Sequence, residues 1–127
     1  MKIRLSTISD RPRVFSLINR HSKIGPGLLP EVIPVVVDDN DEIISGVCIY
    51  YDISTPLAMA SWTFADDEKH NTIKITKSFM MLFDALPEIV GESTEVLLAN
   101  VNPVFQRMLK KRGYIINHTN TQAFIKT

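Results

Sequence analysis

The 127-residue sequence is poor in cysteine, histidine and glycine, the residues of disulfides, zinc sites and phosphate-binding loops. Cys48 is the only cysteine, so no disulfide can form within the chain, and its apolar surroundings predict a small buried side chain. The three histidines are isolated, without a second His or Cys at ligand spacing, so we expect no metal site. Five glycines are present, and none lies between Gly46 and Gly91.

The sequence also lacks an excess of charge and any long hydrophobic run. Fourteen basic and fourteen acidic side chains give a net charge of zero, which argues against a nucleic-acid partner. No apolar run approaches the ~20 residues of a membrane span, and Met1 to Arg4 are not followed by a secretory apolar segment. We therefore expect a cytoplasmic protein without a membrane partner, and the length predicts a single domain over residues 1–127.

The amino-terminal part reads as a strand followed by an amphipathic helix. Residues 3–7 alternate apolar and polar side chains, which is typical of a strand covered on one face. Ser9 or Asp10 can cap the helix, whose apolar stripe consists of Val14, Leu17, Ile18 and His21. We expect His21 to be a partly buried, hydrogen-bonded side chain rather than a catalytic base.

A hairpin follows, with strands over residues 35–37 and 43–51. The acidic turn Asp38 to Asp41 lacks the glycine and the distal glutamate of a calcium loop, so it predicts a solvated turn. Gly46 lies inside the second strand, where glycine often marks a bulge or a close approach of the backbone.

The central part predicts a strand over residues 57–64, a polar loop over 66–70 and a helix over 73–86, which we expect Pro87 to end. One face of this helix is apolar and the other polar. The apolar face consists of Ile75, Phe79, Leu82, Phe83 and Leu86, and the polar face of Lys74, Lys77, Ser78 and Asp84.

The carboxy-terminal part, residues 94–127, gives the strongest local signals. After a strand over residues 96–99, Asn102 can cap a helix with Pro103 at its first position. Gly113 supplies a left-handed exit, and a closing pair of strands follows. The helix has an apolar stripe and a basic last turn, made respectively of Val104, Phe105, Met108 and Leu109, and of Lys110, Lys111 and Arg112.

Asn102, eleven residues before Gly113-Tyr114, resembles the carboxy-terminal part of the GNAT superfamily of acyl-CoA-dependent N-acyltransferases. The order of elements is similar to that family over essentially the whole chain, and Ile43 to Gly46 resemble the start of its third strand. The resemblance implies an α/β (α+β) fold with a mixed, mostly antiparallel sheet of six to seven strands. It further implies helices on both faces and a fourth and a fifth strand that splay apart.

The same resemblance implies that acetyl-CoA donates an acetyl group to a primary amine. In the family the acyl and pantetheine groups lie along the fourth strand, and the pyrophosphate lies at the start of the next helix, where N–H groups and the helix dipole favour anions. The family's sites correspond here to Trp62, Thr63, Phe64, Thr72, Lys74, Thr76, Lys77, Asn100 and Asn102.

The chain departs from the family in its loop and in its general acid. The glycine-rich pyrophosphate loop is missing, and Asp66-Asp67-Glu68 would repel a pyrophosphate if these side chains faced it. Leu109 occupies the place of the tyrosine that protonates the leaving thiolate in many members. Asp66, Asp67 or Glu68 could act as a general base, or the three could form an ordinary charged loop. No catalytic residue is therefore assigned.

These departures, and Trp62, Asp66, Lys74, Phe79, Asn102, Leu109 and Gly113, also resemble the short GNAT-like proteins of tailed phages, of the internal virion protein A type. This narrower resemblance covers residues 61–114 and leaves two functions open. The first is an active N-acyltransferase. The second is a catalytically degenerate protein that binds a protein partner or serves in virion assembly, in the host cytoplasm or the virion, with Trp62 filling the groove.

Overall fold

The computed structural model describes residues 1–91, 94–98, 103–117 and 122–126. The chain forms two compact units: the first comprises Met1–Ile49 and Trp62–Leu82, and the second comprises Tyr50–Ser61 and Phe83–Thr127. Three elements, β3 (Ile43–Tyr51), β4 (Leu57–Ala65) and α2 (Thr72–Val90), contribute residues to both units.

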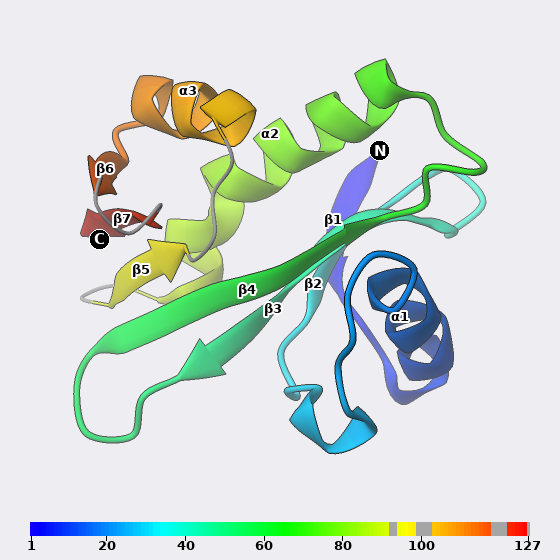
Figure 1. The fold of residues 1–127 in the computed structure, drawn as a ribbon, viewed down its shortest axis with the longest axis horizontal. Helices are drawn as coiled ribbons and strands as arrows, with labels where there is room; N and C mark the ends of the chain where they lie inside the picture. The colour runs from blue at the N-terminus through cyan, green and yellow to red at the C-terminus, as the bar shows by residue number, and fades with distance from the viewer. Residues whose placement is uncertain (92–93, 99–102, 118–121, 127) are drawn as a thin grey trace. The chain divides into compact units, whose positions relative to one another are not determined.

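The first unit is built on antiparallel strands. β1 (Lys2–Leu5) pairs with β2 (Pro34–Val37), and β2 pairs with β3. In Figure 1, α1 (Arg11–Ile18) and the first half of α2 lie on opposite sides of β2 and β3. Two short 3-10 turns, Ile8–Asp10 and Pro26–Leu28, complete the unit. Because both faces are covered, every residue of β2 is buried.

The predicted stripe of α1 is confirmed at three of its four positions. Val14, Leu17 and Ile18 are buried, whereas the predicted burial of His21 is wrong, because α1 ends at Ile18 and the His21 side chain is 71% exposed. The predicted hydrogen bond of His21 is present, since its Nε2 lies 3.2 Å from Oδ2 of Asp67. Alternating burial is also absent from β1, where Leu5 is 53% exposed. In this strand the pattern of residues predicts the strand but not the face it buries.

Gly46 marks a close approach of the backbone, as predicted. A Cβ atom at this position would lie 2.8 Å from Cε2 of Phe64 and 2.9 Å from the carbonyl oxygen of Pro34. Since Cβ atoms do not tolerate contacts this short, glycine is required where the ring of Phe64 crosses β3.

Ser78 corrects the prediction for the polar face of α2. Its side chain is buried, and its Oγ lies 2.7 Å from Oγ of Ser45 on β3 and donates to the carbonyl oxygen of Ile75 at 2.6 Å. The pair of hydroxyls satisfies both side chains inside the first unit. Ser78 therefore packs against the sheet although its residue type suggested solvent.

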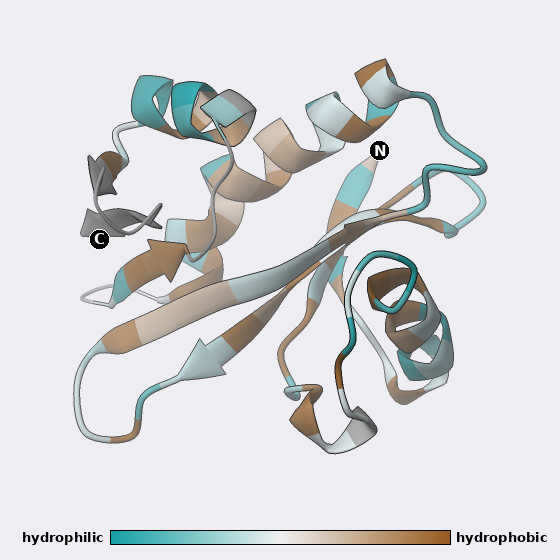
Figure 2. Ribbon diagram, viewed as in Figure 1, coloured by the Kyte–Doolittle hydropathy of each residue, from teal (hydrophilic) through white to brown (hydrophobic). Residues whose placement is uncertain are grey.

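The second unit contains the parallel pair of the fold. Residues Leu57–Ala60 of β4 pair in parallel with β5 (Glu95–Leu98), β5 pairs antiparallel with β7 (Gln122–Lys126), and β7 pairs antiparallel with β6 (Ile115–Asn117). Figure 2 shows a largely hydrophobic β5 and a mainly hydrophilic α3 (Pro103–Lys111). The predicted fold class is confirmed: a mixed, mostly antiparallel α/β fold in which β4 and β5 are parallel.

Pro87 does not end α2, which continues to Val90. A proline inside a helix has no N–H to donate to the carbonyl oxygen four residues earlier, here that of Phe83. The buried Tyr114 hydroxyl donates to this oxygen at 3.0 Å instead. A neutral side chain from beyond α3 thus supplies the hydrogen bond that the proline removes, and the helix continues through it.

The end of α3 follows the prediction. Gly113 adopts a φ of 88°, and the N–H groups of Gly113 and Tyr114 donate to the carbonyl oxygens of Lys110 and Leu109 at 3.2 and 3.0 Å. This left-handed exit brings Tyr114 into the core. The predicted cap, Asn102, lies outside the described residues.

Candidate functional site

The region of β4 that the sequence identifies as the acyl site lies beyond the described pairing of β4 with β5. The described register stops at Ala60 and Leu98, while β4 continues to Ala65. Two residues beyond Ala60, Trp62 has a φ of 55°. A bulky side chain at positive φ is an outlier of the kind that clusters at functional sites, where the surrounding structure maintains the strain.

The three predicted residues of β4 have different environments. Trp62 is half-buried, Thr63 is exposed and Phe64 is buried. Because Phe64 packs over Gly46, its side chain belongs to the core of the first unit. Only the backbone of Phe64 and the side chains of Trp62 and Thr63 are therefore available to a ligand.

The loop between β4 and α2 is organised by Asp66, which is 2% exposed. Its backbone N–H donates to the carbonyl oxygen of Ile44 at 2.9 Å, and its carbonyl oxygen accepts from the N–H of His70 at 3.2 Å. Its carboxylate accepts from the N–H of Lys69 at 3.3 Å and from Nη2 of Arg13 at 2.5 Å. Asp66 thus fixes the loop through both its main chain and its side chain.

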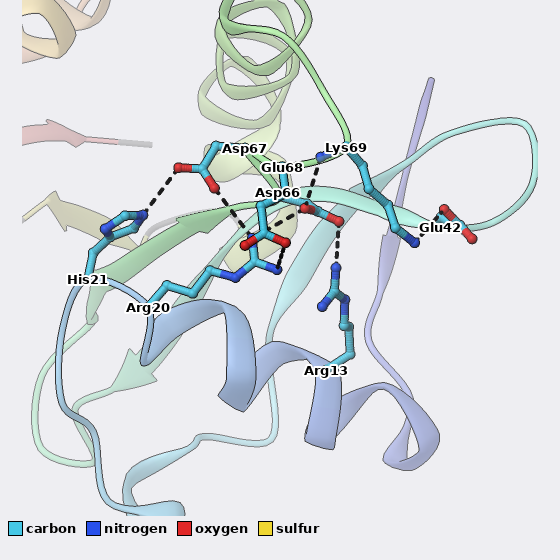
Figure 3. A network of polar contacts seen from close by, with 8 residues as sticks. All are labelled: Arg13, Arg20, His21, Glu42, Asp66, Asp67, Glu68 and Lys69. Carbon is cyan, nitrogen blue, oxygen red and sulfur yellow. Dashed lines mark hydrogen bonds and ion pairs between the residues drawn. The ribbon is translucent and has the colours of Figure 1, made fainter.

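The whole acidic run of this loop is paired with α1 and the segment that follows it (Figure 3). Nη1 of Arg20 lies 3.3 Å from Oδ1 of both Asp66 and Asp67, and its Nη2 lies 3.3 Å from Oε2 of Glu68. Nε2 of His21 lies 3.2 Å from Oδ2 of Asp67. The acidic side chains that sequence reasoning expected to repel a phosphate are therefore neutralised in part by cations of the first unit.

Ionisation of Asp66 and of Asp10 is favoured by the hydrogen bonds that their carboxylates accept. Burial alone would raise the pKa of Asp66, but hydrogen bonds from Arg13, the Lys69 N–H and Arg20 outweigh it and hold the pKa below its ordinary value. At the other end of α1, the hydrogen bond from Arg4 lowers the pKa of Asp10 to about 2. A carboxylate held ionised in this way is a poor proton acceptor, so Asp66 is unsuited to act as a general base.

His70, also in this loop, has a buried ring nitrogen, Nε2, without a hydrogen-bond partner among the described residues. Its side chain is 8% exposed, and its Nε2 lies 4.0 Å from Oδ2 of Asp38.

The first turn of α2 has the features of an anion site. Asn71 caps the helix, since its Oδ1 accepts from the N–H of Lys74 at 2.8 Å. In the described part of the chain, the N–H groups of Thr72 and Ile73 have no protein acceptor. Such groups point out of the helix end together with its positive dipole and can bind phosphate oxygens.

The four predicted residues of α2 fall into two pairs. At about 100° per residue, Thr72 and Thr76 lie within about 40° of each other, and Lys74 and Lys77 within about 60°. The two pairs are on different flanks of the helix. Thr72 and Lys74 belong to its first turn, whereas Lys77 lies in the second turn, farther from the helix end. Asn100 and Asn102, also predicted, lie outside the described residues.

Sequence reasoning missed Arg13 and Arg20. A signal was present, because the two residues are seven apart and thus on one side of a helix, while an acidic run of three occurs elsewhere in the chain. Nothing in the sequence pairs the two segments, and only the fold brings them together. Leu109, in the place of the family's tyrosine, is fully buried and offers no proton.

Two general findings concern the described residues only. They contain no group of three or more His, Cys, Asp or Glu side chains that could hold a metal ion. None of their helices is long and apolar enough to cross a bilayer.

Comparison with known proteins places this geometry in a known fold. No protein-family model matches the sequence, and no curated protein sequence does either. Among solved structures, a spermidine N-acetyltransferase SpeG chimera from Vibrio cholerae and hSSAT matches with a TM-score of 0.71 and 12% identity, over 99% of this chain and 96% of that one.

Two further solved structures match the same fold. The GNAT family N-acetyltransferase YhbS from Escherichia coli, in complex with CoA, matches with a TM-score of 0.68 and 14% identity, over 98% of this chain and 80% of that one. An acetyltransferase of the GNAT family from Staphylococcus aureus Mu50 matches with a TM-score of 0.65 and 11% identity, over 98% of each chain. The chain therefore has the fold of the GNAT N-acetyltransferases.

Proposed function

We propose that the protein is an acyl-CoA-dependent N-acyltransferase that transfers an acetyl group to a primary amine. The observation that carries the proposal is the first turn of α2, where the N–H groups of Thr72 and Ile73 and the lysines of the helix form a cationic end. By the resemblance of the sequence to the family, this helix start corresponds to the one where the family binds pyrophosphate. Solved neighbours in complex with CoA support the same ligand.

The residues present fit this ligand without the glycines of the family loop. Glycine serves to let the backbone approach a phosphate closely. Here the loop before α2 is folded back by Asp66, and the first-turn N–H groups stay accessible because Thr72 and Ile73 are exposed. Lys74 and Lys77 would add positive charge, and Trp62 and Thr63 would line the acyl and pantetheine part. When bound, acyl-CoA supplies the activated acyl group.

The protein's own contribution to the chemistry would be orientation and polarisation. Backbone N–H groups near Trp62, whose positive φ turns the strand, can stabilise negative charge that develops on an acyl oxygen. Holding the amine close to the acyl carbon supplies much of the remaining rate. With Leu109 in place of a tyrosine, the leaving thiolate takes its proton from solvent or from the amine.

The same leucine favours a second candidate function, a degenerate GNAT-fold protein that acts by binding a protein partner. Leu109 is fully buried and carries no proton donor. The resemblance to phage-encoded GNAT-like proteins points in the same direction and suggests a phage origin. In that case Trp62, which is half-buried, would fill the acyl site.

Calorimetric titration with acetyl-CoA tests the first proposal. We expect measurable heat and a rise in melting temperature with ligand concentration. Replacing Lys74 and Lys77 together by alanine should weaken binding about tenfold, since each removes a charge near the phosphates. The matched control is Lys110→Ala with Lys111→Ala, a basic pair at the end of α3, which should leave the affinity unchanged. Absence of heat and of a thermal shift at millimolar acetyl-CoA would overturn the proposal and favour the binding role.

A further inference from the structure

The acidic run before α2 poses an electrostatic problem for any anion at the helix end. Asp66, Asp67 and Glu68 lie within six residues of Thr72, and acidic side chains just before a helix are attracted to its N–H groups. Left free, they would compete with a bound phosphate for the same donors and repel it. The structure shows all three of them turned to another element (Figure 3).

We infer that Arg13 and Arg20 are positioning residues of the proposed acyl-CoA site, which hold these three carboxylates by ion pairs and so keep their charge off the first turn of α2. The inference rests on the proposed function. It assigns to two arginines of α1 and its following turn the task that glycines perform in the family loop. They make the helix end accessible to phosphate without contacting the phosphate themselves.

The contacts of the two arginines support these positioning roles. Arg13 binds the buried Asp66 at 2.5 Å, which anchors the start of the loop. Arg20, whose side chain is 20% exposed, binds one oxygen of each of the three carboxylates at 3.3 Å and so spans the acidic run. Because Asp67 and Glu68 are 52% and 74% exposed, no packing holds them, and Arg20 is their main restraint.

Arg11, at the start of α1, provides a control of the same residue type. Its guanidinium donates to the carbonyl oxygens of Pro30 and Leu29 at 2.8 and 2.9 Å and contacts none of the three carboxylates. Arg11→Gln removes the same charge from the chain as Arg20→Gln, so a difference between the two variants reports the contact with the loop and not net charge.

The test is a double-mutant cycle read by calorimetry with coenzyme A. Arg20→Gln should weaken binding about tenfold, Arg11→Gln less than twofold, and Asp67→Asn with Glu68→Gln should strengthen it severalfold. In the Asp67→Asn, Glu68→Gln background, Arg20→Gln should change the affinity less than twofold, because the only carboxylate left to Arg20 is Asp66, which Arg13 also holds. A purely structural arginine would lower the melting temperature without this rescue.

Two results would overturn the inference. The first is equal affinity of the Arg20→Gln and Arg11→Gln variants. The second is an undiminished effect of Arg20→Gln in the neutral background, which would mean that Arg20 contacts the phosphate directly.

Amide hydrogen exchange separates failure of this inference from failure of the proposed function. If wild type does not bind coenzyme A, the proposed function fails. The loop is then judged without ligand: Arg20→Gln should speed exchange over residues 66–73 relative to Arg11→Gln. Equal exchange in the two variants would show that Arg20 does not hold the loop and would overturn the inference.

Discussion

The two units hold their irregular segments by different means. In the first unit the loop after β4 is held by ion pairs from Arg13 of α1 and from Arg20, just after α1, to Asp66, Asp67 and Glu68. In the second unit the turn after α3 is held by a left-handed glycine, by the neutral hydroxyl of Tyr114 on the carbonyl oxygen of Phe83, and by the ion pair of Arg112 with Asp84 at 2.7 Å. The comparison teaches that the same fold has an acid-sensitive region and an alkali-sensitive region, and each can be tested separately.

The largest expected effect is that of Asp66→Ala. Removing a buried carboxylate leaves Arg13 and Arg20 without their shared partner and frees two backbone segments of the loop, at a cost of about 3 kcal/mol in the free energy of unfolding. Urea denaturation measures it, with the half-exposed Asp67→Ala as control at less than about 1 kcal/mol. Equal costs for the two variants would show that the ion pairs of the buried carboxylate do not hold the first unit.

Acid should destabilise the first unit. The folded-state pKa of Asp10 is lowered to about 2 and that of Asp66 is lowered too, so the stability that they contribute is present above the unfolded pKa near 4. It is lost as the pH falls through the folded pKa, with Asp10 alone accounting for about 2 kcal/mol. Denaturation curves between about pH 5 and pH 2 measure the loss. Asp10→Asn should flatten the pH dependence, and an unchanged slope would contradict the assignment.

Alkali should act on the second unit. Burial, and then the charge of Asp84, raises the pKa of Tyr114 above its ordinary value, so the folded state keeps the proton. The stability that protonated Tyr114 contributes is fully present below the unfolded pKa near 10. It is lost as the pH rises above this value, by about 1.4 kcal/mol at about pH 11. Tyr114→Phe removes the titrating group. The loss of unfolding free energy at high pH in the wild type, minus the loss in this variant, therefore gives the contribution of Tyr114. No difference between the two proteins would refute the prediction.

The smallest expected effect concerns the hydroxyl of Tyr114. Tyr114→Phe should cost about 1 kcal/mol, because it removes a buried hydrogen bond to the Phe83 carbonyl oxygen. In a Pro87→Ala background the same change should cost much less, since the alanine N–H can donate to that oxygen within the helix. Additive free energies in this cycle would show that the hydroxyl does not compensate for the proline.

Much of the fold follows from local patterns in the sequence. Gly46, Gly113 and the apolar stripes of α1 and α2 each express a rule that operates over a few residues. The structure confirms both glycines and most positions of the stripes, the exceptions being the exposed His21 and the partly buried Ile75. The predictions fail at residues whose environment depends on a partner far away in the sequence. Pro87 lies inside α2 because Tyr114 satisfies Phe83, and Ser78 is buried because Ser45 faces it. Neither pairing can be read from spacing.

The candidate site divides in the same way. Residues of α2 could be proposed from the sequence because a helix start is a local feature. The arginines that neutralise the loop could not, since Arg13 and Asp66 are 53 positions apart and meet only through the fold. Trp62 was proposed as a site residue, but its positive φ depends on the surrounding strands.

The most direct measurement is an amide-resolved NMR titration with coenzyme A. If the first turn of α2 binds the pyrophosphate, the N–H signals of Thr72 and Ile73 and the indole N–H of Trp62 should show the largest shifts, while those of Lys110 and Lys111 at the end of α3 stay in place. Saturable shifts centred on other residues, or no shifts at all, would contradict the account.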